Sequence, residues 1–118
     1  MRVPGHPTLI RRMLDRRLKQ LVPAGPILAA SLMQVSKRCG QPSCHCHHDG
    51  PLHQAYQVTF KEDGKTRTLY VPQDLLAEVR TWVQENQRLK TLTQEVSQLT
   101  RALIQGHVGH RKRRRGRR

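Results

Sequence analysis

Residues 54–71 read QAYQVTFKEDGKTRTLYV and carry the clearest structural pattern of the sequence. In its first half Tyr56, Val58 and Phe60 alternate with polar residues, which is the two-residue period of a strand with one apolar face. An Asp-Gly pair follows and favours a tight two-residue turn, because glycine tolerates a positive φ. Residues 66–71 then supply the return strand. The sequence therefore predicts an antiparallel β-hairpin.

A shorter alternation precedes the hairpin in SLMQVSKR, residues 31–38, and predicts a further strand. The sheet would then have two or three strands. Tyr56 and Tyr70 could stack on nucleic-acid bases, but the simpler prediction is that both pack the sheet against a helix. Trp82 is expected to be the largest core residue beneath the hairpin.

The segment between these strands, KRCGQPSCHCHHDGPLH, holds all three cysteines and four of the seven histidines. Cys44 and Cys46 are two residues apart, so in an extended segment both point to the same side. The Gly and Pro before them allow a reversal that brings Cys39 back. Zinc takes four thiolate or imidazole ligands in a tetrahedron, so a fourth ligand is needed. The cluster predicts a zinc site.

His53 is the predicted fourth ligand, because it opens the hairpin strand and would tie the loop to the sheet. His47, His48 and Asp49 are alternatives. An iron–sulfur cluster fits less well because a fourth cysteine is missing, and three uncoordinated thiols are the simplest alternative. Three thiolates make a weak Lewis acid, and the only nearby carboxylate is that of Asp49. We therefore expect a structural zinc whose binding energy contributes to folding.

Two segments show helical periodicity. Residues 8–22 carry one apolar stripe and end before Pro23, while residues 75–104 carry a longer stripe that Asn86 interrupts. Gly106 is expected to end the second helix. At 1.5 Å per residue this helix would be about 45 Å long, more than the rest of a small domain can cover. Its stripe resembles a short coiled-coil edge and should pack on helix 8–22 or on a second copy of the chain. The seam residues are Leu89, Leu92, Val96, Leu99 and Leu103.

The formal charge is +14, and seven of the last eight residues are Arg or Lys. So basic a protein attracts polyanions, and we expect nucleic acid, DNA or RNA, rather than a membrane. The end of the chain should be disordered, because its charges repel one another and it has no core to join. A weaker patch surrounds the hairpin tip at Lys61, Lys65 and Arg67. The main candidates for phosphate contact are Arg11, Arg12, Arg16, Arg17, Arg111, Lys112, Arg113, Arg114, Arg115, Arg117 and Arg118.

Other protein classes are disfavoured by what the sequence lacks. It has no run of 18 apolar residues, so no membrane-spanning helix is expected. An odd number of closely spaced cysteines does not indicate a disulfide framework and fits a cytoplasmic location. No nucleophile–base set and no paired carboxylates are visible, so we expect no catalytic residues and no small-molecule substrate.

Three segments together resemble a known family: RCGQPSCHC, HQAYQVTFKEDGKTRTLYVP and LLAEVRTWVQENQRLKTLTQEVSQLTRALI. The family is an uncharacterised prokaryotic domain of unknown function. Its members are small basic proteins with a C-G-x3-C-x-C cluster, a GKTRT-x-YVP hairpin and a long C-terminal helix. The resemblance covers residues 28–104 and implies that Cys39, Cys44, Cys46 and His53 form the family's cluster. Genomes rich in mobile elements often carry the family, which implies an accessory role there but no activity.

The sequence thus predicts an α+β protein in three parts. Residues 1–26 would form a basic helix and linker, residues 27–105 a zinc-stapled hairpin with a long helix, and residues 106–118 a disordered tail. The expected function is non-enzymatic, largely sequence-nonspecific binding of nucleic acid. The alternative is a protein-interaction or homodimerisation module that acts through residues 75–104, and a metal-dependent enzyme is the least favoured interpretation.

Overall fold

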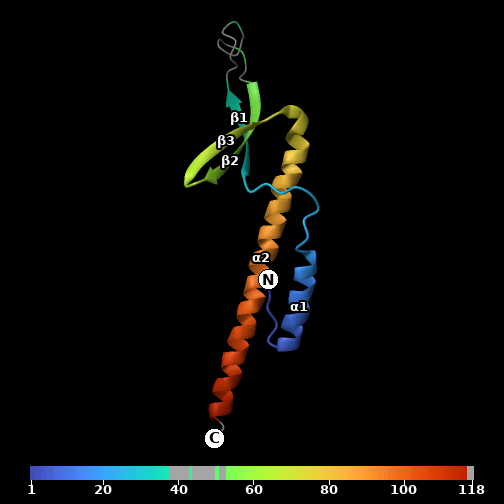
Figure 1. The fold of residues 1–118 in the computed structure, drawn as a ribbon, viewed down its shortest axis with the longest axis vertical. Helices are drawn as coiled ribbons and strands as arrows, with labels where there is room; N and C mark the ends of the chain where they lie inside the picture. The colour runs from blue at the N-terminus through green and yellow to red at the C-terminus, as the bar shows by residue number, and fades with distance from the viewer. Residues whose placement is uncertain (38–42, 44–49, 51–52, 117–118) are drawn as a thin grey trace. The chain divides into compact units, whose positions relative to one another are not determined.

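The computed structural model describes residues 1–37, 43, 50 and 53–116. The order of elements, drawn in Figure 1, confirms the predicted α+β class. The elements are α1 (Pro7–Gln20), β1 (Ser31–Lys37), β2 (His53–Glu62), β3 (Lys65–Val71), the short 3-10 helix η2 (Gln73–Leu75) and α2 (Leu76–Gly116).

The chain divides into two compact units. We call Met1–Ala24 with Gln87–Arg118 the helical unit, and Gly25–Asn86 the sheet unit. The first division lies close to the linker predicted around residue 26. The second lies inside α2, next to Asn86, the residue that interrupts the apolar stripe. The N-terminal helix therefore shares a unit with the second half of α2 and does not stand apart.

The sheet is antiparallel, with β2 between β1 and β3. Its register pairs Val58 with Leu32 on one side and with Leu69 on the other. The β2–β3 turn is the predicted two-residue turn, with φ of 52° at Asp63 and 79° at Gly64. Two consecutive positive φ values define the turn whose twist matches that of the flanking strands. The hairpin prediction is confirmed, and the shorter alternation forms the third strand.

One face of the sheet carries the core of the sheet unit. Val58 is buried there, as are Leu76 and Val79 of α2. The Arg80 guanidinium lies over the Tyr56 ring, 5.5 Å from its centroid, so Tyr56 is on this face as expected. The backbone N–H of Leu28 donates to the carbonyl of Trp82, 3.1 Å away, and ties the chain before β1 to α2.

Two predictions about aromatic residues are wrong. Tyr70 pairs with Gln57, not with Tyr56, so it lies on the other face of the sheet, where it is 62% exposed. Tyr56 and Tyr70 belong to different strands, and which face each one occupies depends on the register between the strands. Trp82 is only half-buried, whereas the smaller side chains of Val58, Leu76 and Val79 are buried.

The core of the helical unit is the seam between α1 and α2, which run antiparallel side by side (Figure 1). Ile10, Leu92 and Leu99 are buried, and Leu99 is completely so. The Arg17 Nε lies 2.6 Å from Glu95 Oε2 and closes an ion pair between the helices. The sequence predicted that the seam packs either on helix 8–22 or on a second copy of the chain. In this structure it packs on α1, which is the helix of the same chain. Pairing with a second copy stays a prediction.

Arg88 fixes the end of α1. Its Nη1 donates to the carbonyl of Gln20 and its Nη2 to the carbonyl of Val22, each at 2.9 Å. Carbonyls at the end of a helix have no partners within it, so a guanidinium satisfies them and complements the helix dipole. This contact holds the last turn of α1 against α2.

The predicted end of the long helix is wrong. α2 continues past Gly106 and Gly109 to Gly116, so residues 106–116 are helical rather than disordered. Adding a residue to a formed helix is far easier than starting one, and Arg and Lys are good helix formers. Each glycine costs only about 1 kcal/mol, and the chain tolerates it.

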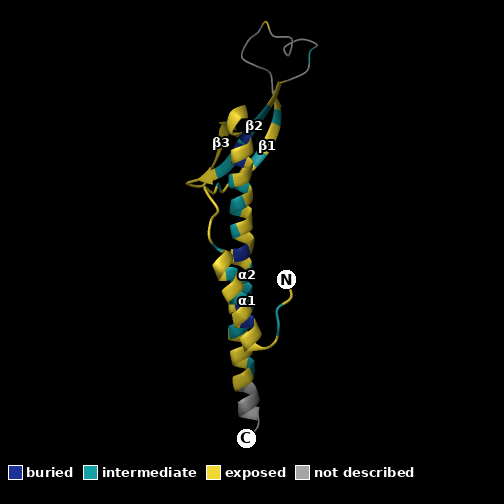
Figure 2. Ribbon diagram, turned by 90° about the vertical axis from the view of Figure 1, so that its right-hand side faces the viewer, coloured by how far each residue is buried: buried dark blue, intermediate teal, exposed yellow. Residues whose placement is uncertain are grey.

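The described part of the chain has a thin core. Figure 2 shows both helices mostly exposed or half-buried. Among the described residues only six apolar side chains are buried: Ile10, Val58, Leu76, Val79, Leu92 and Leu99. With so few buried groups, each one contributes a large share of the stability of its unit.

Leu99→Ala should therefore destabilise the helical unit by about 2–5 kcal/mol, the range for emptying a buried leucine site. Urea unfolding followed by helical circular dichroism measures this. Ile104→Ala is the matched control, because Ile104 lies five residues on in the same helix and is 62% exposed. Equal effects of the two substitutions would show that α1 does not cover the seam.

Gly64→Ala should destabilise the hairpin by about 1–2 kcal/mol, the cost of a left-handed conformation for a residue with a Cβ. A Cβ at this position meets nothing within 4 Å, so the cost arises from backbone conformation alone. Gly25→Ala is the control, with equally open space and no positive φ. Amide hydrogen exchange of β2 and β3 reports the effect, and unchanged protection in Gly64→Ala would contradict the turn.

Candidate nucleic-acid interface and metal loop

The charge of the chain is distributed very unevenly between the two units. The sheet unit contains six Lys and Arg and six Asp and Glu, so its formal charge is zero. The helical unit contains sixteen Lys and Arg and two Asp and Glu. The entire net charge of +14 therefore belongs to the helical unit.

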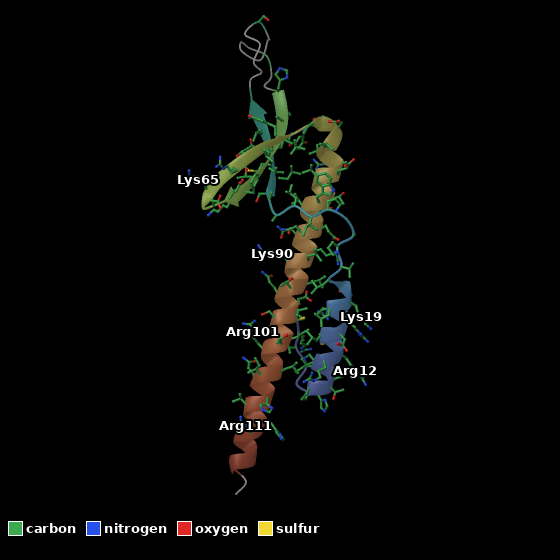
Figure 3. The ribbon with its side chains drawn as sticks, viewed as in Figure 1. Arg12, Lys19, Lys65, Lys90, Arg101 and Arg111 are labelled. Carbon is green, nitrogen blue, oxygen red and sulfur yellow. The ribbon has the colours of Figure 1, made fainter. Side chains whose placement is uncertain are left out.

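On α1, three of the four predicted arginines are exposed: Arg11, Arg12 and Arg16. Arg17 is half-buried and engaged with Glu95, so it closes the seam instead of facing solvent. Lys19 is exposed and was not among the predicted contacts. It follows Arg12 by seven residues, two helical turns, and this spacing could have identified it. Figure 3 shows Arg12 and Lys19 projecting from the side of α1 that faces away from α2.

On α2, Lys90 and Arg101 are exposed, and the sequence prediction missed both. They are eleven residues apart, about three turns, so they share one face of the helix. Figure 3 shows both on the side of α2 away from α1. Neither has a charged neighbour directly before or after it in the sequence, so helical spacing is the signal that could have found the pair.

Arg111 is exposed near the end of the described part of α2. Lys112, Arg113, Arg114 and Arg115 follow within the helix, and the directions of their side chains lie outside the described structure. Arg117 and Arg118 lie outside the described residues altogether. The predicted basic end is thus continuous with the helix that carries Lys90 and Arg101.

The helical unit is strongly basic but contains no Phe, Tyr or Trp. All four aromatic residues of the chain, Tyr56, Phe60, Tyr70 and Trp82, belong to the sheet unit. Proteins that hold single strands commonly stack bases on aromatic side chains. The helical unit can therefore attract phosphates, but it has no Phe, Tyr or Trp ring on which an unpaired base could stack, and its only rings are the imidazoles of His6, His107 and His110.

The predicted metal loop connects two paired strand ends. Cys39, Cys44 and Cys46, and the alternatives His47, His48 and Asp49, lie outside the described residues. Among the residues that are described, no three potential metal ligands come together. His53, the predicted fourth ligand, is the first residue of β2 and pairs with Lys37, the last residue of β1.

This pairing is compatible with His53 as a ligand. Cys39 follows Lys37 by two residues, so the chain can carry it at most about 7 Å from that position. His53 lies beside Lys37 across the sheet, so the two-residue distance in sequence from Lys37 to Cys39 allows both proposed ligands to bind one ion. Zinc binding itself stays a prediction.

Within the described ranges, none of the helices is long and apolar enough to cross a membrane.

Comparison with models of known protein families identifies the family of the chain. A model of a domain of unknown function, DUF6788, matches residues 10–81, more than half of the sequence. The chain belongs to this family. Comparisons with curated proteins and with solved structures found no match.

The matched range differs from the resemblance seen in the sequence, which began at residue 28. It starts at Ile10 and so includes most of α1, the whole sheet and the first turns of α2. It ends at Thr81, before Lys90, Arg101 and the basic end. The helix that covers the seam, α1, therefore lies mostly within the DUF6788 match, and the five seam residues of α2 lie beyond it.

Cys44→Ser should remove bound zinc and lower the melting temperature, because the metal would replace core that the sheet unit lacks. Metal analysis of the purified protein and thermal melting measure the two effects. The adjacent Ser43→Ala is the control, since Ser43 is exposed and carries no ligand atom suited to zinc. A metal-free native protein, or a Cys44→Ser variant that melts like the native protein, would contradict the site.

Proposed function

We propose that this DUF6788 protein is a non-enzymatic nucleic-acid-binding protein that contacts phosphate backbones through its helical unit. The observation that carries the proposal is the division of charge: +14 in the helical unit and zero in the sheet unit. Lys and Arg side chains that neutralise phosphates release condensed counterions, which drives binding without regard to base sequence.

The exposed cations are spaced along straight helices. Lys90 and Arg101 are about 16 Å apart along α2, and Arg12 and Lys19 about 10 Å apart along α1, at 1.5 Å per residue. Duplex DNA presents one negative charge per about 1.7 Å of its axis, so cations at either spacing can each lie close to a phosphate. Such contacts position a protein on nucleic acid but do not read its sequence.

In this proposal the sheet unit has a structural role. Zinc held by Cys39, Cys44, Cys46 and His53 would fix the loop between β1 and β2. Reduced thiols and a bound zinc suit the cytoplasm. The family resemblance adds an accessory role beside the machinery of a mobile element.

The alternative function, protein interaction through residues 75–104, has less support. Leu92 and Leu99 are buried in the single chain, so a partner helix could reach them only if α1 moved away. The nucleic-acid proposal needs no such rearrangement, because the cations that it uses are already exposed.

Two triple variants with equal charge test where binding occurs. Arg12→Gln, Arg101→Gln and Arg111→Gln remove three cations from the helical unit. Lys61→Gln, Lys65→Gln and Arg67→Gln remove three exposed cations from the sheet unit. The logarithm of the binding constant for duplex DNA is measured against the logarithm of salt concentration. The first triple should reduce the slope by about 0.9 for each phosphate that the variant no longer neutralises.

The sheet-unit triple should leave that slope nearly unchanged. If both triple variants reduced the slope equally, cations of either unit would contribute to binding alike. The helical unit would then not be the specific site of phosphate contact. No measurable binding by the native chain at physiological salt would reject nucleic-acid binding itself.

A further inference from the structure

The helical unit has two basic faces that point in opposite directions. Each α-helical residue turns the chain by about 100°. Arg101 lies two residues beyond the buried Leu99, so it lies on the far side of α2 from the seam. Lys19 lies nine residues beyond the buried Ile10, half a turn around α1. Figure 3 shows the same arrangement, with Arg12 and Lys19 on one outer side of the helix pair and Lys90 and Arg101 on the other.

We call Arg12, Arg16 and Lys19 the α1 face, and Lys90 and Arg101 the α2 face; all five side chains are exposed. Packed helices have axes about 8–10 Å apart, and each helix is about 10 Å wide. The two faces are therefore about 20 Å apart. This distance exceeds the Debye length of about 8 Å at physiological salt, so the faces act independently.

The seam holds the faces in opposition. The Arg17–Glu95 ion pair and the Arg88 contacts to the carbonyls of Gln20 and Val22 restrict rotation of α1 about its axis. Burial of Ile10 and Leu99 adds to this restriction. The cations of α1 thus cannot turn to the side of α2 without breaking these contacts.

A single duplex cannot use both faces. Its persistence length is about 50 nm, far greater than the width of the helix pair, so it does not wrap around such a small object at low cost. The partner is expected to be a duplex, because the helical unit has no Phe, Tyr or Trp for stacking and a duplex has the higher charge density. A face left open by the first duplex remains available for a second.

We propose that one molecule binds two nucleic-acid duplexes at once, one on the α1 face and one on the α2 face, and so bridges them. The bridging proposal rests on the proposed binding of nucleic acid and adds to it a second site on the same unit. It also assigns a role to α1, which both covers the seam and carries one of the two sites.

The test uses the full chain with two short DNA duplexes of identical sequence, one labelled with a fluorescent donor and the other with an acceptor. Anisotropy of one labelled duplex measures binding, and energy transfer between the two measures bridging. Sedimentation of the complex gives its stoichiometry. The native chain should produce energy transfer in complexes of one protein with two duplexes.

Two variants separate the faces. Arg12→Gln, Arg16→Gln and Lys19→Gln remove the α1 face, and Lys90→Gln with Arg101→Gln removes the α2 face. Each should still bind one duplex but reduce energy transfer at least fivefold under conditions where that duplex is saturated. Lys61→Gln, Lys65→Gln and Arg67→Gln form the control, which should bridge like the native chain. Both face variants keep the basic end of α2, so their loss of transfer would exclude that segment as the bridge.

Three results would overturn bridging. One is binding without energy transfer in the native chain, which leaves the proposed function intact. Another is full energy transfer in both face variants. The third is a complex with two proteins for two duplexes, because association of the protein would then bring the duplexes together. Absence of any anisotropy change would instead reject nucleic-acid binding along with bridging.

Discussion

Burial of the α2 seam by α1 is the interaction on which the rest of the helical unit depends. Leu92 and Leu99 would otherwise expose an apolar stripe on the second half of α2. Covering that stripe removes apolar surface from water, which stabilises the helical unit by about 25 cal/mol for each Å² buried. The same packing decides which cations contact the other helix and which project only into solvent. Arg17 and Arg88 close the seam, whereas Arg12, Lys19, Lys90 and Arg101 remain exposed.

The structure also separates charge from the elements that define the fold. The sheet, its Asp-Gly turn and the cysteine loop lie in a neutral unit, within the range that matches DUF6788. More than half of the net charge, +8 of +14, lies beyond that range, in residues 82–118. In the proposed function, this separation leaves the sheet unit a structural role and leaves contact with the polyanion to the helices. A single helix, α2, contributes residues to both units and joins them covalently.

Local patterns predicted local structure well. The alternation around Val58 and the Asp63–Gly64 pair specified the hairpin, because period and turn chemistry act over a few residues. The two amphipathic helices, and the burial of Leu92 and Leu99, followed from helical spacing in the same way. The side of the sheet on which Tyr70 lies did not follow, since it depends on inter-strand register. Nor did the cover of the seam, because an exposed apolar stripe is equally suited to a helix of the same chain or of another.

The exposed cations of the helical unit were only partly predictable, for a related reason. A run of arginines at residues 111–118 is visible by inspection, but charge repulsion alone predicts disorder there, whereas the helix propagates past Gly106. Lys90 and Arg101 are isolated in sequence and become one face only when the helix is formed. Arg17 showed the opposite error: the sequence marked it as a phosphate contact, and the structure engages it with Glu95.

The most direct test of the account is to map where duplex DNA contacts the protein, by following backbone amide chemical shifts during a titration. If the helical unit binds the duplex, the changes should be concentrated in α1 and in α2 beyond Gln87, with β2 and β3 little affected. Changes centred on β2 and β3, with α1 and the second half of α2 unaffected, would contradict it. The sheet unit would then be the binding surface, and the charge of the helices would have no part in recognition.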